Sequence, residues 1–498
     1  MASRNRDHDD GDSEPELLAE EDALEEIQEG DADVAMDSDN EEEVTLVNDS
    51  IAYFDAHKDS VFAIAQHPVF PSLVATGGSE GDADDAPGKG YVFDTSAAAS
   101  RPVLPASYSS DPSAAGRQNP QLGPLFSLDG HSDSINALAF TLPTGDYLVS
   151  GGLDGRLRAY AVGASEGSAP RFKFVAESQE VPEVNWLAPC PSPDRPNTVA
   201  LGASDGSVWV YVLEGSDLRI AQSYFLHTAA STAGAWTPDG GLLATVSEDG
   251  SLYVWDVWGL AAGQGLATDN GMTVVSLTAA DARFAVDGGL FSVAVSPNGS
   301  FLAAGGAGGV VKIVGLPRLS EAAGQTQKKP QKGGRARQAE PAAQAGTILA
   351  SLQVQSDGVE TLAFAPTAAA PLLATGSVDG SIAVFDTSRS FALRRHIGAA
   401  HDGEAVVRLE WVRSPSGQGQ GQWLLTSAGM DGVVRRWDLR GAAPSQHTAG
   451  QPPAGLVKEW RGHRGAGEGG GVLGFVQGET GERVVTAGDD GLVLVFEA

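Results

Sequence analysis

Short apolar segments alternate along most of the chain with turns rich in glycine, aspartate and proline. The clearest copy of this pattern runs from His227 to Asp256, and it contains three apolar segments: Ala233–Trp236, Leu242–Ser247 and Ser251–Asp256. The turns between these segments are Thr-Pro-Asp-Gly and Glu-Asp-Gly, which favour tight hairpins. The pattern therefore predicts three short antiparallel strands whose sheet must stack on further copies to cover both faces.

The same pattern recurs eight times, and each copy places a glycine-containing turn before its third apolar segment. The third segments end at Asp94, Tyr160, Tyr211, Asp256, Gly315, Asp386, Asp438 and Glu497. A fourth, outer strand is expected between consecutive copies, for example in Pro124–His131 and Thr347–Val354. We therefore predict an all-β ring of eight four-stranded blades, with seven blades as the alternative. Residues 44–54 are expected to supply the outer strand of the last blade and so close the ring.

Four residues of the clearest copy form a recognisable set: His227 before the first strand, Thr245 in the second, Asp249 in the second turn and Trp255 in the third. The histidine recurs at positions 57, 131, 401 and 463, and the aspartate at positions 154, 205, 379, 431 and 490. This set resembles that of WD40 repeats, which fold as β-propellers. The resemblance implies that the four side chains form an internal hydrogen-bond network that locks the strands together. A catalytic His/Asp pair is the alternative, and the repetition of the set argues against it. The fifth copy departs from the pattern, since Gly308 replaces the aspartate.

Negative charge dominates the composition. The formal charge of the 498 residues is −33, and residues 1–50 contain 20 acids and two arginines. Such a chain repels nucleic acid and anionic lipid and attracts basic partners. Cys190 is the single cysteine, which excludes an intramolecular disulfide, and a reducing compartment is expected. No apolar run is long enough to span a membrane.

Composition also suggests the domain boundaries. Residues 1–43 are acidic and poor in aromatic residues, so we expect a disordered leader followed by the propeller at 44–498. Two insertions, 96–123 and 317–345, are rich in proline, glycine, alanine and glutamine and are also expected to be disordered. Both follow a third strand and therefore emerge on the bottom face, as does a shorter insertion at 413–422. The top face remains comparatively clear, which favours it as the binding surface.

Acidic residues recur just before the first strand of seven copies, at the mouth of the expected central channel. They are Asp59, Asp133, Glu180, Asp287, Asp357, Glu404 and Glu468, and a long turn of the first copy adds Asp82, Asp84 and Asp85. Aspartate at such positions also stabilises turns, and that is the plainer interpretation. A nearly complete ring of carboxylates favours a second interpretation, a receptor for a peptide rich in lysine and arginine.

Three segments, Tyr53–Pro68, Leu201–Tyr211 and Val484–Ala498, lie behind the acidic leader and resemble one WD-repeat family. That family contains the angio-associated migratory cell protein of animals and a fungal chaperone that escorts the large-subunit ribosomal protein uL sixteen. The resemblance implies a monomeric cytoplasmic chaperone that binds the basic tail of a ribosomal protein and delivers it to the pre-60S particle. The alternative is a scaffold in signalling or cell migration, as the animal relative suggests.

Motifs of catalysis or cofactor binding are lacking. Gly305–Gly309 and Gly467–Gly471 are not followed by Lys-Ser or Lys-Thr, so they do not form a phosphate-binding loop. We therefore expect neither an enzyme nor a cofactor or metal, and no direct contact with nucleic acid or membrane. The basic run 328–337 is interpreted as a solvated loop, with a nuclear-import signal as the alternative.

Overall fold

The computed structural model describes residues 48–81, 86–98, 121–163, 170–268, 271–319, 345–366, 371–413, 423–440, 453–464 and 470–498. Internal contacts separate Met1–Thr45 from a unit that comprises Leu46–Ala498. The fold described below is that of the second unit. The leader predicted at 1–43 lies outside the described residues.

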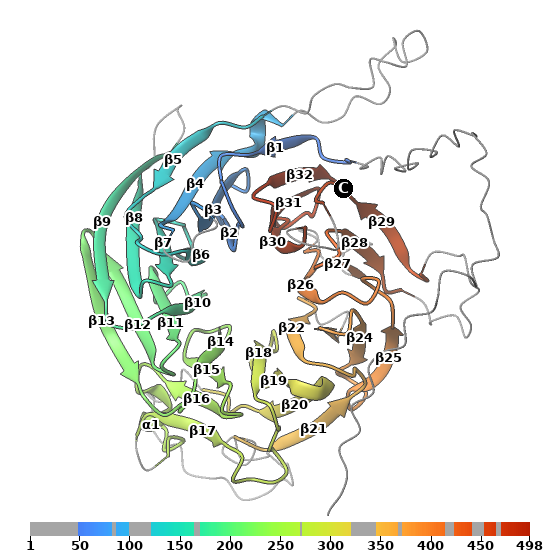
Figure 1. Cartoon of the computed structure of the whole chain (residues 1–498). Helices are drawn as coiled ribbons and strands as arrows, with labels where there is room; N and C mark the ends of the chain where they lie inside the picture. Colours follow the sequence, from blue (N-terminus) through green and yellow to red (C-terminus); the bar gives the residue numbers. More distant parts are fainter. Residues whose placement is uncertain are drawn as a thin grey trace, which may run out of the picture. The chain divides into compact units, whose positions relative to one another are not determined.

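Strands of the described residues form eight antiparallel sheets of four strands each. Figure 1 shows the sheets arranged as blades around a central channel, with one inner strand of each blade beside it. Inner strands of neighbouring blades contact one another all round the ring, from β2 to β30 and back to β2. The eight-bladed propeller predicted from the sequence is confirmed, and the alternative of seven blades is wrong.

Each blade consists of an inner strand, two middle strands and an outer strand. Eight inner strands line the channel: β2 (Ala63–Gln66), β6 (Ile135–Phe140), β10 (Val184–Pro189), β14 (Ser231–Trp236), β18 (Leu290–Val295), β22 (Val359–Phe364), β26 (Val406–Trp411) and β30 (Val472–Val476). The second strands follow: β3 (Leu73–Ser79), β7 (Tyr147–Gly152), β11 (Thr198–Ala203), β15 (Leu242–Ser247), β19 (Phe301–Gly306), β23 (Leu372–Ser377), β27 (Leu424–Gly429) and β31 (Arg483–Gly488).

The third strands are β4 (Gly88–Asp94), β8 (Arg156–Gly163), β12 (Val208–Glu214), β16 (Leu252–Asp256), β20 (Val310–Gly315), β24 (Ile382–Asp386), β28 (Val434–Asp438) and β32 (Val493–Glu497). The outer strands are β5 (Pro124–Leu128), β9 (Arg171–Gln179), β13 (Asp217–Tyr224), β17 (Thr273–Leu277), β21 (Ile348–Gln353), β25 (Ala392–Ile397), β29 (Leu456–Trp460) and β1 (Ala52–Phe54). A single-turn helix, α1 (Leu260–Gly263), was not expected from the sequence and follows β16.

The outer strand of the eighth blade comes from the beginning of the propeller. β1 pairs antiparallel with β32, with Ala52 opposite Val495 and Phe54 opposite Val493. The Ile51 amide adds a hydrogen bond of 2.7 Å to the Val495 carbonyl. This pairing confirms the predicted closure and covers an edge of β32 that would otherwise be open.

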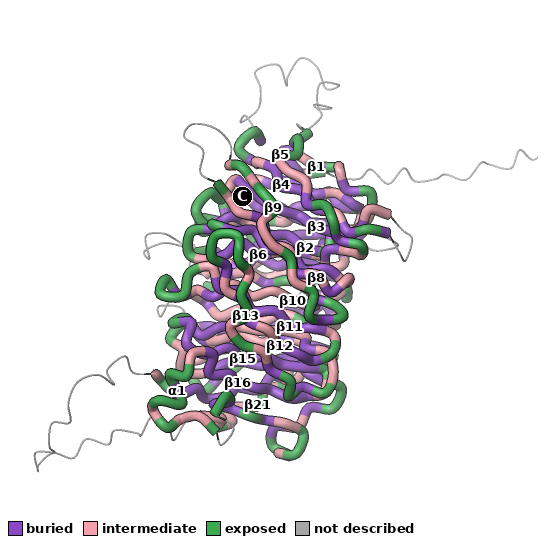
Figure 2. The backbone as a smooth tube through the Cα atoms, turned by 90° about the vertical axis from the view of Figure 1, so that its left-hand side faces the viewer, coloured by how far each residue is buried: buried purple, intermediate pink, exposed green. Residues whose placement is uncertain are grey.

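Burial is concentrated between the blades, because each sheet presents both faces to its neighbours. The second strand of a blade lies in the middle of the sheet, and every residue of β7, β11, β15 and β23 is buried. In Figure 2 buried residues are concentrated in strands inside the blades, whereas exposed residues gather in the connections at both edges and along outer strands such as β9 and β13. Trp186 fills one interface so closely that a Cβ atom at Gly234 would lie 2.1 Å from its ring.

The predicted insertions begin and end with ordered residues, which corrects their boundaries. Thr95–Ala97 forms a short 3-10 helix, and Leu122 is buried and donates its amide to the Tyr53 carbonyl at 2.8 Å. Pro317–Leu319 is likewise described. The disorder predicted for the central parts of both insertions concerns residues outside the described ranges. Within those ranges, no helix has the length and hydropathy of a membrane span.

Candidate functional site

The connections of the propeller fall on two opposite faces because the strands of each blade are antiparallel. One face carries the connections from each outer strand to the next inner strand, together with the turns between second and third strands. We call this the top face, and the opposite one the bottom face. The insertions 96–123 and 317–345 follow the third strands β4 and β20, so they leave from the bottom face.

The side chains of the WD set are joined by hydrogen bonds inside blade four. Nε2 of His227 lies 2.8 Å from the Thr245 hydroxyl, which also accepts a 2.8 Å hydrogen bond from Trp255. Asp249 does not contact His227 directly: Nδ1 of His227 bonds Ser251, whose amide donates to Asp249. Burial alone would raise the pKa of Asp249, but hydrogen bonds from Ser251 and Thr228 outweigh it and lower that pKa to about 2. These polar atoms are thus occupied in holding the strands together.

Other blades repeat this network with substitutions. In blade two, His131 contacts Ser150 at 2.8 Å and Asp154 at 3.0 Å. Blade six has a glutamine in place of the histidine, and Gln355 accepts a 2.6 Å hydrogen bond from Thr375 and donates to the Ser381 carbonyl. The glutamine amide therefore replaces imidazole in the same position.

Blade seven adds a buried arginine to the network. His401 contacts Asp431 at 2.8 Å and Ser427 at 2.7 Å, and the guanidinium of Arg435 also bonds Asp431. Arg435 further pairs with Asp402 and Glu459, both at 2.9 Å. A buried guanidinium requires such partners, because an unpaired charge inside a protein is strongly destabilising.

The histidines make stability dependent on pH. Burial lowers the pKa of His57 and His227 from the ordinary value of 6.5 to about 4. Because the unfolded chain binds these protons more tightly, stability is lost as the pH falls from about 6.5 towards 4, by about 2 kcal/mol per histidine at pH 5. We expect the double variant His57→Gln/His227→Gln, which copies Gln355, to lose correspondingly less stability between pH 7 and pH 5. Urea unfolding at both pH values measures the difference, and an unchanged pH dependence would contradict it.

Six of the ten predicted ring acids lie in described residues, all in connections of the top face. Asp59, Asp133, Glu180, Asp287, Asp357 and Glu404 each precede an inner strand: β2, β6, β10, β18, β22 and β26. They thus occur in six different connections around the channel mouth (Figure 1). Asp82, Asp84, Asp85 and Glu468 lie outside the described residues.

None of these six carboxylates is paired with a cation in the described part of the chain. Asp133 and Asp357 accept hydrogen bonds from the amides of Ser134 and Gly358, at 2.6 and 2.7 Å, so the turn-stabilising interpretation also has support. Each contact uses one oxygen of the carboxylate. The charge remains uncompensated and available to a basic ligand.

Sequence reasoning missed one acid at this mouth, Glu360 in β22. Most inner strands shift register after their first residue, and Glu360 lies at this position, between Val359 and Thr361. Partial burial raises the pKa of Glu360, and the negative charge of Asp357 raises it further. A cation bound nearby would relieve this repulsion. The position that could have identified Glu360 is the second residue of the inner strand, where the register shifts. The alternation of apolar and polar residues along the sequence did not single out this position.

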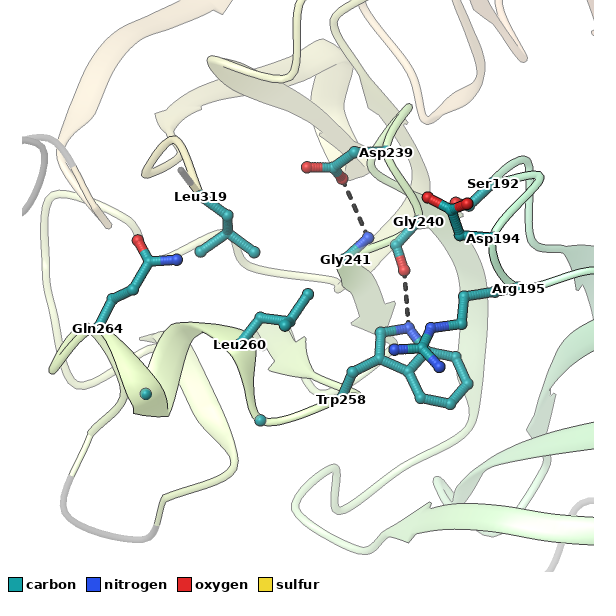
Figure 3. A pocket seen from close by; sticks show the side chains of 12 residues that line it. Ser192, Asp194, Arg195, Asp239, Gly240, Gly241, Trp258, Leu260, Gln264 and Leu319 are labelled. Carbon is teal, nitrogen blue, oxygen red and sulfur yellow. Dashed lines mark hydrogen bonds between the residues drawn. The ribbon is translucent and has the colours of Figure 1, made fainter. Parts of the chain in front are cut away.

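The bottom face also contains a hollow, between blades three and four, with a volume of about 440 Å³ (Figure 3). Trp258 lies in its wall and donates a 2.9 Å hydrogen bond to the Gly240 carbonyl, while the Arg195 guanidinium lies 4.4 Å from its ring centroid. Asp194 and Asp239 line the same hollow. Arg195 and the two carboxylates give this hollow charges of both signs, whereas the six described ring acids of the top face are all negative. Among the described residues, no group of three or more His, Cys, Asp or Glu side chains is arranged to hold a metal.

Comparison with known proteins identifies the family to which this chain is similar. The model of the WD domain, G-beta repeat, matches residues 122–160, 220–256 and 284–314. The ribosome assembly protein SQT1 of Saccharomyces cerevisiae is 33% identical over 237 residues, which are 46% of this chain and 47% of that protein. The match thus spans about half the length of this curated relative.

Solved structures match over a longer range. The crystal structure of Chaetomium thermophilum Sqt1 is 64% identical, with a TM-score of 0.78, and the match covers 91% of this chain and 98% of that one. A second structure, of the same protein bound to the N-terminus of the ribosomal protein L10, is 62% identical with a TM-score of 0.76. It covers 91% of this chain and all of that one. The chain therefore belongs to the Sqt1 family of WD-repeat β-propellers.

Proposed function

We propose that this protein is a ribosome-assembly chaperone that binds the N-terminal segment of an L10-type ribosomal protein on its top face. The observation that carries the proposal is the set of six unpaired carboxylates in different connections around the channel mouth. Glu360, the second residue of inner strand β22, adds a further acid at the top end of that strand. The Chaetomium relative bound to the L10 N-terminus supports the choice of partner.

The mechanism follows from electrostatics. A concentrated negative potential accelerates encounter with a basic segment, and carboxylates form charge-assisted hydrogen bonds with arginine. Such binding weakens as salt rises and competes with ribosomal RNA, whose phosphates attract the same residues. The chaperone would therefore shield the basic segment and release it onto the assembling subunit. Binding alone, without a chemical step, is sufficient for this role.

Charge reversal of the top face tests the proposal. We expect the triple variant Asp133→Lys/Asp357→Lys/Glu404→Lys to bind a synthetic peptide of the L10 N-terminus at least 100-fold more weakly than the parent chain. The physical reason is that three attractive contacts become repulsive in one confined region. Fluorescence polarisation of the labelled peptide measures the change in affinity at about 0.15 M salt. At this salt concentration, interactions between exposed charges more than roughly 8 Å apart are largely screened, so the measurement reports mainly close contacts.

A matched variant separates local contacts from net charge. Asp194 is an exposed acid in a connection of the bottom face, and Glu214 and Asp217 are exposed acids at the ends of β12 and β13 that border the turn there. Replacing these three with lysine changes the net charge equally, and we expect less than a threefold effect on peptide binding. Equal losses in the two triple variants would contradict a top-face site, and unchanged binding in the top-face variant would do so as well.

A further inference from the structure

A second groove lies on the bottom face, where the last blade meets the first. Its volume is about 740 Å³, and its lining includes Pro68, Val69 and Pro71 on one side and Glu479, Glu482 and Arg483 on the other. The first three belong to the connection between β2 and β3 of blade one, and Glu479 and Glu482 to the connection between β30 and β31 of blade eight. We call it the seam groove, because it exists only where ring closure joins these two blades.

The wall from blade one exposes apolar side chains on a rigid turn. Val69 and the adjoining Phe70 are 52% and 53% exposed. Their backbone amides both donate to Nδ1 of the buried His67 at 3.1 Å, and the Phe70 carbonyl accepts from Leu73 at 2.9 Å. Nε2 of Gln66 closes the turn with a 2.6 Å hydrogen bond to the Pro71 carbonyl. The turn therefore holds two apolar side chains towards solvent at little further cost in conformational entropy on binding.

The opposite wall is acidic. Glu479 and Glu482 are exposed, and neither forms an ion pair with another described residue. The nearby cation, Arg483, is already committed, because its guanidinium donates to the carbonyls of Thr95 and Ala98 at 2.6 and 2.8 Å. It holds the connection after β4 in place and does not pair with the two glutamates. The groove thus offers an apolar wall facing two exposed carboxylates that have no ion-pair partner among the described residues.

We infer that the seam groove is a second docking site, for a short peptide segment that carries an aliphatic or aromatic anchor next to lysine or arginine. The apolar side chain packs against Val69 and the neighbouring prolines Pro68 and Pro71, and the cation pairs with Glu479 and Glu482. The site lies on the face opposite the ring acids, roughly 20 Å away through strands of five or six residues. Both sites can therefore be occupied at once, and the inference does not depend on the function proposed above.

A peptide library identifies the ligand of this groove. A phage-displayed library of random dodecapeptides is panned on the full chain carrying Asp133→Lys/Asp357→Lys/Glu404→Lys, so that the top face no longer captures basic peptides. We expect the selected sequences to combine an aliphatic or aromatic residue with an adjacent lysine or arginine. One selected peptide is then labelled and titrated by fluorescence polarisation.

Two groove variants and two controls decide the outcome. We expect Glu479→Lys/Glu482→Lys and Val69→Ser/Phe70→Ser each to weaken the labelled peptide at least tenfold. Glu214→Lys/Asp217→Lys and Leu349→Ser/Leu393→Ser change exposed residues of the same kinds elsewhere, and we expect less than a twofold effect.

Three results would overturn the inference. Selected peptides without basic residues would do so, as would equal binding to the parent and the groove variants. The third is a dimer of the parent chain in light scattering that Val69→Ser/Phe70→Ser converts to a monomer, since the groove would then be occupied by a second copy. Circular dichroism of each variant confirms that it is folded before binding is measured.

Discussion

Phe54→Ala is expected to lower the free energy of unfolding by about 3–5 kcal/mol, the usual cost of removing a buried phenylalanine. Phe54 is 1% exposed and belongs to β1, the strand that completes the last blade. Its ring stacks on Phe93 with centroids 4.7 Å apart, and it meets Tyr91 edge-on at 5.4 Å. The side chain therefore joins the closing strand to blade one, and its loss weakens both the packing and the closure. Urea unfolding followed by circular dichroism measures the change.

An exposed residue of another outer strand provides the control. Leu349 lies in β21 and is 47% exposed, so Leu349→Ala is expected to cost less than about 1 kcal/mol. If Phe54→Ala cost no more than this control, the packing of the closing strand would not contribute to stability. Phe54→Leu keeps most of the apolar volume and is expected to fall between the two.

The second large effect concerns the buried ion pair of blade seven. Asp431→Ala is expected to lower the free energy of unfolding by about 3 kcal/mol, because Arg435 then remains buried without its innermost partner. Nδ1 of His401 also loses its 2.8 Å contact with Asp431. Asp402 and Glu459 still pair with Arg435, which keeps the expected cost at the lower end of the range for buried pairs.

Asp281→Ala is the matched surface variant. Asp281 pairs with Arg283 at 2.7 Å, but the arginine side chain is 82% exposed. Exposed pairs contribute little to stability because solvent screens them, so only a small loss is expected. Similar losses in the free energy of unfolding for Asp431→Ala and Asp281→Ala would show that burial does not increase the contribution of Asp431 to stability. High salt provides a further distinction, because it screens the exposed pair and leaves the buried one nearly unaffected.

The candidate site was only partly predictable. The ring acids could be placed on one face because they precede the inner strands, and the positions of those strands follow from local turns. The structure places six of these acids on the top face, and their role in binding stays a prediction. Glu360 was missed because its position depends on a register shift in β22, and alternation along a strand does not reveal such a shift.

The hydrogen-bond network of the WD set was also only partly predictable from the sequence. The sequence indicated that His227, Thr245, Asp249 and Trp255 belong together, and their spacing places them at one end of blade four. It did not indicate that Ser251 lies between His227 and Asp249, because that depends on side-chain geometry within 3 Å. Nor did it indicate that Arg435 joins the equivalent network of blade seven.

By itself, the sequence determined the order of the blades and favoured eight over seven, because hairpin turns and alternating apolar residues act over a few neighbouring positions. The tertiary structure decided what happens between distant segments. Ala52 lies opposite Val495 only after eight blades have packed around the channel, and the seam groove is formed by two connections from opposite ends of the propeller. Local propensities do not specify such contacts, which depend on how the packing between all the blades adds up to a closed ring.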